Sequence, residues 1–398
     1  MTAAARPLLN RSLAEFGTTI FAEMSQLAVT TGAINLGQGF PDTDGPAAVL
    51  DAACRAIAEG RGNQYPPGPG IPELRHAIAE HQARTYNLTY DPDTEVLVTA
   101  GATEAIAASL IALLEPGDEV IALEPYYDSY AACIAIAGAR RVPVTLRPDG
   151  DRFTLDLDEL RAAVTSRTRL ILLNTPHNPT GTVLDRAQLT AIAELCAERD
   201  LLAVTDEVYE HLVFDGGAHI PLATLPGMRE RTVSISSAGK TFSVTGWKVG
   251  WVCASPALTT AVRTAKQFLT YVSSGPFQYA VAEALALPPE YFTEFTADLQ
   301  AKRDLLGAAL ADAGFGVMRT QGTYFLTADI RPLALPGPEG ANGEAFCRAL
   351  PHRAGVVAIP SQVFYDHREQ GAPYVRFAFC KRPEVLAEAA ARLKTLAG

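Results

Sequence analysis

Short apolar runs rich in β-branched residues alternate with segments of helical spacing across residues 95–254. The apolar runs predict strands at 95–100, 119–123, 141–146, 169–174, 201–205, 232–235 and 248–254. Helical patterns lie between them at 103–114, 129–137, 156–164 and 185–199. Because two parallel strands must be joined by a crossover, which is usually a helix, this order predicts a mostly parallel seven-stranded sheet covered by helices on both faces, an α/β fold.

The remainder of the chain predicts a second, smaller unit. With 398 residues the chain exceeds the size at which one hydrophobic core usually suffices, so two domains are expected. After Gly314 the pattern changes to short strands mixed with helices, which indicates a smaller α+β domain. We expect an N-terminal arm with part of the small domain at 1–45, a large domain at 46–286 and a small C-terminal domain at 287–398.

Charge and composition argue against several classes of protein. The net charge of −11 disfavours nucleic acid or an anionic membrane as a partner. The six cysteines are scattered without a Cys-x-x-Cys pair and are typical of reduced core residues, and the seven histidines show no spacing of metal ligands, so no metal is expected. No apolar run near the N-terminus has the length of a signal peptide or a membrane span, which predicts a soluble cytoplasmic protein.

Lys240 lies where a predicted strand ends, in the stretch Ser-Ser-Ala-Gly-Lys-Thr-Phe that follows Ile235. A lysine held in a pocket can lose its proton and attack a carbonyl carbon to form a Schiff base, and pyridoxal phosphate (PLP) is the common aldehyde partner. A surface lysine in a loop is the simpler alternative. A phosphate-binding loop is rejected, because that motif requires glycine where Ser234 stands and a helix directly afterwards.

Several groups near predicted strand ends suit a phosphate. Ala102 and Thr103 open a helix directly after a strand, so backbone N–H groups, the helix dipole and a hydroxyl meet there. Ser237 and Lys248, which flank Lys240, can reach the same anion. The alternatives are an ordinary strand–helix turn and a solvated lysine.

A second set of residues suits the pyridine ring of PLP. Asn178, held between prolines, can donate to the phenolic oxygen, and Tyr209 can reach the same atom. Asp206, at the end of a strand, can keep the ring nitrogen protonated by charge pairing. Tyr126, after the strand at 119–123, can stack on the ring. A helix N-cap for Asp206, a turn around Asn178 and a buried aromatic for Tyr126 are the alternatives.

Arg376 lies within the apolar run Tyr-Val-Arg-Phe-Ala-Phe and therefore needs an anionic partner. A substrate α-carboxylate would match its planar guanidinium, and an internal ion pair with Asp or Glu is an equally good explanation. Phe21 and Tyr271 are candidate aromatic residues of the substrate pocket.

Together these residues resemble the class I/II aminotransferases, which are fold-type I PLP enzymes, over residues 34–396. The resemblance implies that Lys240 is the Schiff-base lysine and proton shuttle, and that Arg376 and the Gly39 backbone bind the α-carboxylate. It gives the phosphate, ring and phenolic-oxygen roles described above to Ala102, Thr103, Tyr126, Asn178, Asp206, Tyr209, Ser237 and Lys248. It further implies that Tyr65 reaches the phosphate of a neighbouring subunit, so that a homodimer shares its active sites. Many members carry arginine where this chain has Lys248, a departure that keeps the charge.

Within this family the chain resembles the kynurenine/glutamine transaminase branch, through the runs at 35–42, 63–65 and 239–251. The runs at 64–70, 127–130 and 379–382 resemble actinobacterial N-succinyldiaminopimelate aminotransferases. The resemblance implies amino-group exchange between an L-amino acid and a 2-oxo acid, with glutamate and 2-oxoglutarate as one pair and N-succinyl-L,L-diaminopimelate, in lysine biosynthesis, as the substrate. A kynurenine, glutamine or methionine transaminase with cysteine-conjugate β-lyase activity is the alternative.

A PLP-sensing transcription regulator is an interpretation from a different class. Such proteins carry a DNA-binding module before the aminotransferase-like region. Only a short arm precedes Ile34 here, and the net charge is acidic, so this interpretation is disfavoured.

Overall fold

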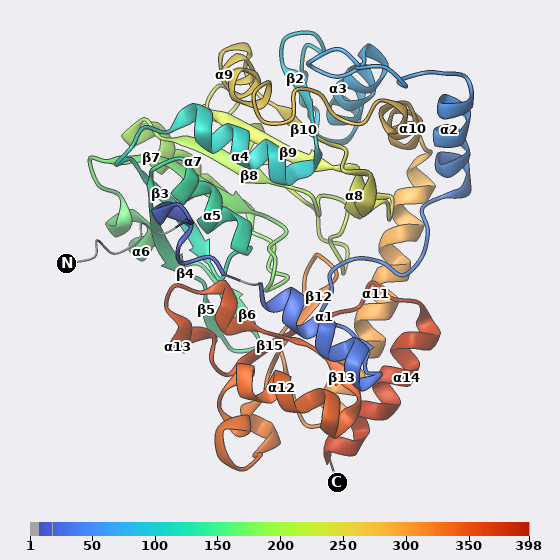
Figure 1. Cartoon of the computed structure of the whole chain (residues 1–398). Helices are drawn as coiled ribbons and strands as arrows, with labels where there is room; N and C mark the ends of the chain where they lie inside the picture. Colours follow the sequence, from blue (N-terminus) through green and yellow to red (C-terminus); the bar gives the residue numbers. More distant parts are fainter. Residues whose placement is uncertain (1–7, 18, 398) are drawn as a thin grey trace, which may run out of the picture.

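A mostly parallel seven-stranded sheet forms the centre of the larger part of the molecule (Figure 1). The computed structural model describes residues 8–17 and 19–397. In order across the sheet, the strands are β2 (Val96–Thr99), β10 (Gly250–Cys253), β9 (Thr232–Ser237), β8 (Leu202–Asp206), β7 (Thr168–Asn174), β3 (Glu119–Glu124) and β4 (Arg140–Thr145). Neighbouring strands are parallel, except that β10 is antiparallel to both β2 and β9. The predicted α/β architecture is confirmed.

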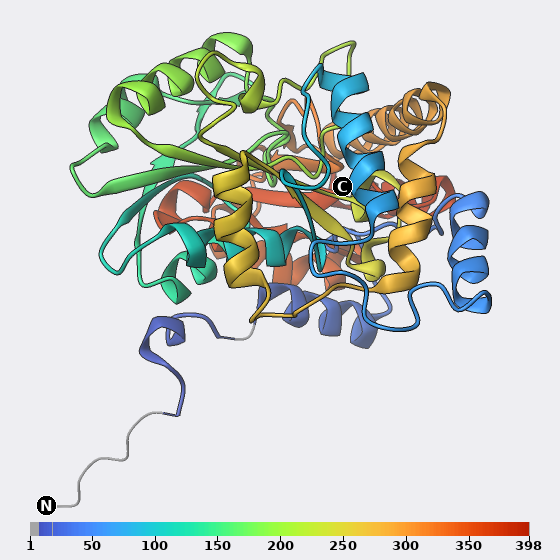
Figure 2. The same ribbon diagram turned by 90° about the horizontal axis from the view of Figure 1, so that it is seen from above.

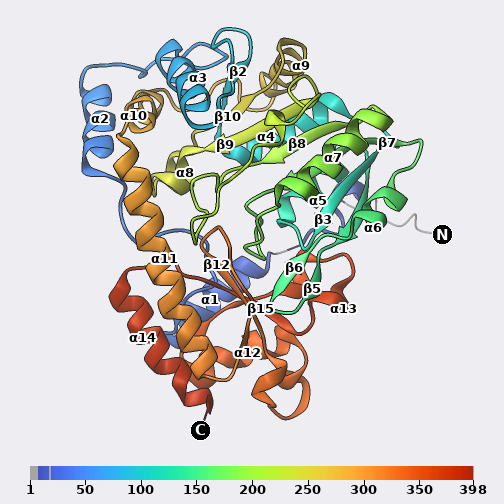
Figure 3. The same cartoon turned by 180° about the vertical axis from the view of Figure 1, so that it is seen from behind.

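Helices cover both faces of this sheet, as Figures 1 and 3 show from opposite sides. One face packs against α4 (Gly101–Leu113), α5 (Asp128–Ile136) and α9 (Pro256–Lys266), and the other against α6 (Leu157–Ala163) and α7 (Arg186–Arg199). Every residue of β3 and β9 is buried. Strands covered on both faces lack an exposed side, which explains why the sequence has continuous apolar runs instead of strict alternation.

A third group of helices lies beside β2 and β10, at one end of the sheet (Figure 2). It consists of α2 (Ala47–Ala58), α3 (Pro72–Tyr86) and α10 (Gly275–Leu285). Their buried residues form one core with those of β2 and β10. The Pro/Gly-rich segment at 64–70 connects α2 to α3 without regular structure.

The smaller α+β part of the molecule combines the two ends of the chain. Its sheet has the order β11 (Gly316–Val317), β12 (Phe325–Asp329), β15 (Tyr374–Ala378) and β14 (Ile359–Pro360), with antiparallel pairs. The long helix α11 (Pro289–Asp312) packs there with α12 (Gly343–Ala354) and α14 (Pro383–Leu393). From the N-terminal side, α1 (Ile20–Thr31) joins the same core and β1 (Ile34–Asn35) pairs in parallel with β13 (Val356–Val357). The domain boundaries after residues 45 and 286 stay predictions.

Short elements complete the chain: the hairpin of β5 (Arg147–Asp149) and β6 (Arg152–Thr154), and the single helical turns α8 (Ala238–Thr241) and α13 (Arg368–Gly371). Within the part of the chain that the structure describes, no helix combines the length and the apolar character needed to span a bilayer.

Helix α1 begins at Ile20, because Thr19 is its N-cap and accepts a hydrogen bond from the backbone N–H of Ala22. One local prediction differs from the structure. The strand expected over 248–254 begins at Gly250, because Lys248 has a left-handed backbone conformation with φ of 55°. Residues 1–7 of the predicted arm lie outside the described residues.

Candidate active site

A cavity of about 470 Å³ opens at the carboxyl ends of β7, β8 and β9. These strands end in Asn174, Asp206 and Ser237, all of which line the cavity, as expected for ligand sites of open parallel sheets. Most of the candidate residues named from the sequence meet there, namely Phe21, Gly39, Ala102, Thr103, Asn178, Asp206, Tyr209, Ser237, Lys240, Lys248 and Arg376.

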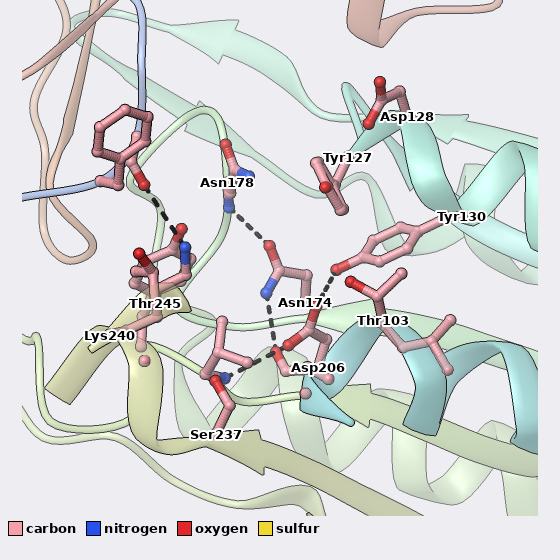
Figure 4. A pocket seen from close by; sticks show the side chains of 18 of the residues that line it. Thr103, Tyr127, Asp128, Tyr130, Asn174, Asn178, Asp206, Ser237, Lys240 and Thr245 are labelled. Atoms are coloured by element: carbon pink, nitrogen blue, oxygen red, sulfur yellow. Dashed lines mark hydrogen bonds between the residues drawn. The ribbon is translucent and has the colours of Figure 1, made fainter. Parts of the chain in front are cut away.

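Lys240 lies in α8, the single turn that follows β9, and faces the cavity opposite Tyr127 and Tyr130 (Figure 4). Its Nζ lies 3.5 Å from the carbonyl oxygen of Gly39. Burial lowers the pKa of Lys240 to about 8, although the nearby Cys380 and Asp206 act in the opposite direction. A lysine with a lowered pKa has more of the neutral, nucleophilic amine near neutral pH.

The N-terminus of α4 forms one wall of the cavity. Its N-cap residue, Ala100, makes no side-chain capping hydrogen bond, so the first backbone N–H groups of the helix are left for another acceptor. Ala102 and the hydroxyl-bearing Thr103 line the cavity at this point. The aligned peptide dipoles of the 13-residue helix add a positive potential that favours an anion.

Lys248 brings a positive charge to the same helix terminus. Its Nζ would lie 3.1 Å from a Cβ added to Gly101, so the ammonium group stands directly beside the start of α4. The close approach depends on Gly250, where an added Cβ would lie 2.5 Å from the backbone carbon of Gly101. With the hydroxyl of Ser237, which also lines the cavity, these groups form a cradle suited to a phosphate dianion.

Asp206 is buried at the end of β8 and is held from two sides. The hydroxyl of Tyr130 donates to its Oδ2 at 2.5 Å, and the backbone N–H of Val208 donates to its Oδ1 at 3.4 Å (Figure 4). Burial raises the pKa of Asp206 to about 6, against the effect of these hydrogen bonds and of Lys240. A cation placed beside this carboxylate would lower its pKa again, and a protonated ring nitrogen is such a cation.

A chain of hydrogen bonds joins Arg376 to the end of β8. Nη1 of Arg376 donates to Oδ1 of Asn178 at 2.9 Å. The backbone N–H of Asn178 donates to Oδ1 of Asn174 at 2.7 Å, and Nδ2 of Asn174 donates to the carbonyl oxygen of Asp206 at 2.8 Å (Figure 4). Because Oδ1 of Asn178 is engaged and its Nδ2 has no acceptor among the described residues, the amide N–H groups can donate to a ligand.

Arg376 is a buried cation with only 2% of its surface exposed. Its Nη2 donates to the carbonyl oxygen of Gly37 at 3.0 Å, while Nε has no partner, and no carboxylate of the described residues lies within 4.0 Å of the guanidinium. The rings of Phe325 and Phe364 lie 3.9 and 5.0 Å from its central carbon. Burial lowers the pKa of Arg376 to about 10, so the group remains charged at neutral pH. A buried, unpaired cation favours an anchor for a ligand carboxylate over the internal ion pair.

Three tyrosines named from the sequence do not line the cavity. Tyr126 is buried elsewhere, its backbone N–H donating to the carbonyl oxygen of Phe364 at 2.8 Å, and its neighbour Tyr127 lines the cavity instead. Adjacent side chains point in different directions, and a pair of tyrosines gives no sequence signal for which one faces inward. Tyr65 and Tyr271 are exposed and contact each other edge to face, with ring centroids 5.4 Å apart.

Sequence reasoning missed other residues of the site. Tyr130 belongs to the run Tyr-Asp-Ser-Tyr, which was noted for its resemblance without a role, and Asn174 closes a predicted strand. Gln38 and Asp128 also line the cavity. Tyr324, which donates to the carbonyl oxygen of Gly39 at 2.5 Å, comes from the distant smaller part of the molecule and carries no local signal.

The fold also brings together His81, Glu210 and His211, whose ligand atoms lie within 4.8 Å of one another although their spacing in sequence is not that of a metal site. The Nε2 atoms of the two imidazoles are 2.9 Å apart, a hydrogen-bond distance. Two nitrogen ligands bound tetrahedrally at about 2.0 Å from one zinc ion would be roughly 3.3 Å apart. The two imidazoles are therefore best described as a hydrogen-bonded pair in a buried polar cluster, and not as two ligands of one zinc ion.

One cavity at the edge of the open α/β sheet holds a phosphate cradle, a lysine, a buried acid and an arginine without an acidic partner among the described residues. This combination defines the class of the protein. The sequence model of the family "Aminotransferase class I and II" matches residues 31–393. The chain belongs to this family and is an aminotransferase. Members of the family are generally PLP-dependent.

Individual relatives align with almost the whole chain. The "Probable N-succinyldiaminopimelate aminotransferase DapC" of Mycobacterium tuberculosis is 53% identical, over 97% of this chain and 98% of its own length. The solved structure of N-succinyldiaminopimelate aminotransferase from the same species matches with a TM-score of 0.94, covering 98% of this chain and all of that one. Methionine aminotransferase of Escherichia coli is 40% identical over 98% of this chain and 99% of its length.

Proposed function

We propose that this aminotransferase uses PLP held by Lys240 to exchange an amino group between N-succinyl-L,L-diaminopimelate and the glutamate/2-oxoglutarate pair. The observation that carries the proposal is that one cavity holds both a lysine with a lowered pKa and a buried arginine that has no acidic partner among the described residues. The first group suits the cofactor aldehyde, and the second suits the α-carboxylate that every amino-acid substrate carries.

The donor set fits PLP group by group. The backbone N–H groups at the start of α4, with Thr103, Ser237 and Lys248, would hold the phosphate. Nδ2 of Asn178 and the hydroxyl of Tyr209 would hold the phenolic oxygen, and Tyr127 supplies an aromatic face in the cavity. When bound, PLP supplies an electron sink that stabilises negative charge at the substrate Cα.

The remaining chemistry is assigned to three side chains. Asp206 would pair with the ring nitrogen and keep it protonated, helped by the hydrogen bond from Tyr130. Arg376 would fix the α-carboxylate and thereby the direction of the Cα–H bond. The amine of Lys240, once free, would move the proton from Cα, because it is the one group in the cavity proposed to act as a base.

The choice of substrate rests on similarity. The relative named for N-succinyldiaminopimelate is 53% identical to this chain, whereas those named for methionine and for kynurenine are 40% and 37% identical. N-succinyl-L,L-diaminopimelate, methionine and kynurenine would be compared as amino donors in single-turnover half-reactions, following the cofactor absorbance. We expect the succinylated substrate to give the largest second-order rate constant for the half-reaction. A higher value for methionine or kynurenine would contradict the assignment, and release of pyruvate from a cysteine conjugate would reveal the β-lyase alternative.

A homodimer in the cytoplasm completes the proposal. The exposed aromatic pair of Tyr65 and Tyr271, with the exposed Phe268 and Leu269 nearby in sequence, supports a subunit interface, in which Tyr65 would reach the phosphate in the neighbouring subunit. The six cysteines are all unpaired, which suits a reducing compartment. Light scattering on the purified protein should give twice the mass of one chain, and the mass of a single chain would contradict the dimer.

A further inference from the structure

The carboxylate of Asp128 lines the active-site cavity but takes no part in the roles assigned above. Asp128 is the first residue of α5 and follows Tyr127 directly. In Figure 4 it lies beyond Tyr127 as seen from Asp206. The cavity has two acidic residues among its described lining, and Asp206 is the one engaged by Tyr130. Asp128 is therefore an additional acidic group that faces the space left for a ligand.

Asp128 has no side-chain partner within the described chain. No hydrogen bond joins its carboxylate to another described side chain, and no ion pair within 4.0 Å includes it. Burial raises the pKa of Asp128, while the backbone N–H of Ser129 and the more distant charge of Arg376 act in the opposite direction. A partly dehydrated acceptor without a partner gains most from a ligand that donates a hydrogen bond.

The part of the ligand that meets Asp128 follows from the other assignments. In the proposed function, Lys240 and Asp206 face the cofactor, and Arg376 takes the α-carboxylate. The substrate side chain is the remaining part, and an N–H group on it matches the free acceptor.

Resting on the proposed function, we propose that Asp128 is a specificity-determining residue that accepts a hydrogen bond from an N–H group on the substrate side chain, and so favours amide-bearing amino acids. The secondary amide of N-succinyl-L,L-diaminopimelate is such a group, and so is the primary amide of glutamine. Methionine has a side chain of similar length without an N–H donor and serves as the matched comparison.

A purely structural role for Asp128 makes a different prediction. An acidic residue in the first turn of a helix stabilises that helix through its dipole, whatever the substrate. Asp158, the second residue of α6, also lies in the first turn of a helix, is 98% exposed in its side chain and lies outside the cavity. Asp158→Asn therefore controls for the loss of a first-turn charge, and it should leave the preference between substrates unchanged.

The test compares the holoenzyme with its Asp128→Ala and Asp128→Asn variants in half-reactions with glutamine, methionine and N-succinyl-L,L-diaminopimelate. Losing a hydrogen bond to a charged acceptor should lower kcat/KM for the two amide substrates about tenfold in Asp128→Ala. The value for methionine should stay within a factor of about three, because the methionine side chain donates no hydrogen bond to Asp128. Asp128→Asn keeps an acceptor oxygen without the charge and should show the smaller loss.

Equal losses for glutamine and methionine, or no loss for either, would overturn the proposal. After borohydride reduction, which prevents the cofactor from reacting, calorimetric binding of the same compounds to the parent and the variants reports the same preference without turnover. If N-succinyl-L,L-diaminopimelate does not react but glutamine still shows a selective loss, the proposed function fails and the role of Asp128 stands. If all three compounds react and the variants show no selectivity, the role of Asp128 fails alone.

Discussion

The hydroxyl of Tyr130 donates a hydrogen bond of 2.5 Å to Oδ2 of Asp206, which connects the first turns of α5 to the end of β8. The bond fixes the orientation of a carboxylate that has 5% of its surface exposed. It also stabilises the ionised form, against a burial that raises the pKa of Asp206 to about 6. The position and the charge of Asp206 therefore both depend on a residue from a different layer of the fold.

Asp206→Asn should lower kcat by about a hundredfold, the scale of removing one preorganised electrostatic contact. Tyr130→Phe should cost about tenfold or less, because the carboxylate stays in place and loses one hydrogen bond. Both variants should still bind PLP through its phosphate, which absorbance of the dialysed protein checks. Activity of Asp206→Asn within a few-fold of the parent would contradict its role beside the ring nitrogen.

Arg376→Ala should lower kcat/KM at least about tenfold for amino acids, since charge-assisted pairing is worth roughly 1.5–3 kcal/mol. Arg376→Lys should be impaired too, because lysine keeps the charge but lacks the planar pair of donors. Half-reactions with an amino acid and with its decarboxylated amine distinguish a role of Arg376 in binding the carboxylate from a purely structural role. The loss should be small for the amine, and equal losses on both would show that the carboxylate anchor lies elsewhere.

A matched control for this experiment is Arg348→Ala. Arg348 is half exposed and pairs with Glu23 at 2.8 Å, away from the cavity. Surface ion pairs contribute little, so this variant should keep the activity of the parent toward both compounds.

The rate at which the apoprotein captures PLP should rise with pH between about 7 and 9 and then level off. The neutral amine is the nucleophile, and a group whose pKa is lowered to about 8 is protonated below that pH and neutral above it. Stopped-flow absorbance after mixing apoprotein with PLP measures the rate. A midpoint near 10.5, the ordinary lysine value, would show that burial does not activate Lys240.

The sequence was sufficient for the features that depend on local pattern. The continuous apolar runs predicted the sheet, because strands buried on both faces have no polar side, and polar residues at strand ends marked Asp206 and Ser237. A lysine between small residues after a strand marked Lys240.

Features that depend on distant contacts were not predictable in this way. The bond between Arg376 and Asn178 joins residues 198 positions apart, and only the fold shows that no acid from the described part of the chain pairs with Arg376 instead. The choice between Tyr126 and Tyr127 depends on how the chain enters α5, and the direction of Lys248 depends on a left-handed backbone that its sequence does not require. Contacts across a subunit boundary, such as the one proposed for Tyr65, lie beyond a single chain altogether.

The central claim is that Lys240 carries the cofactor, and borohydride reduction of the purified holoenzyme followed by peptide mass spectrometry tests it most directly. Reduction makes the bond between the lysine and PLP permanent, so the modified residue can be read from the peptide that contains it. We predict one pyridoxyl group per chain on Lys240, and no incorporation together with no turnover in a folded Lys240→Ala variant. A pyridoxyl group on Lys248, Lys266 or any other lysine, with Lys240 unmodified, would contradict the account.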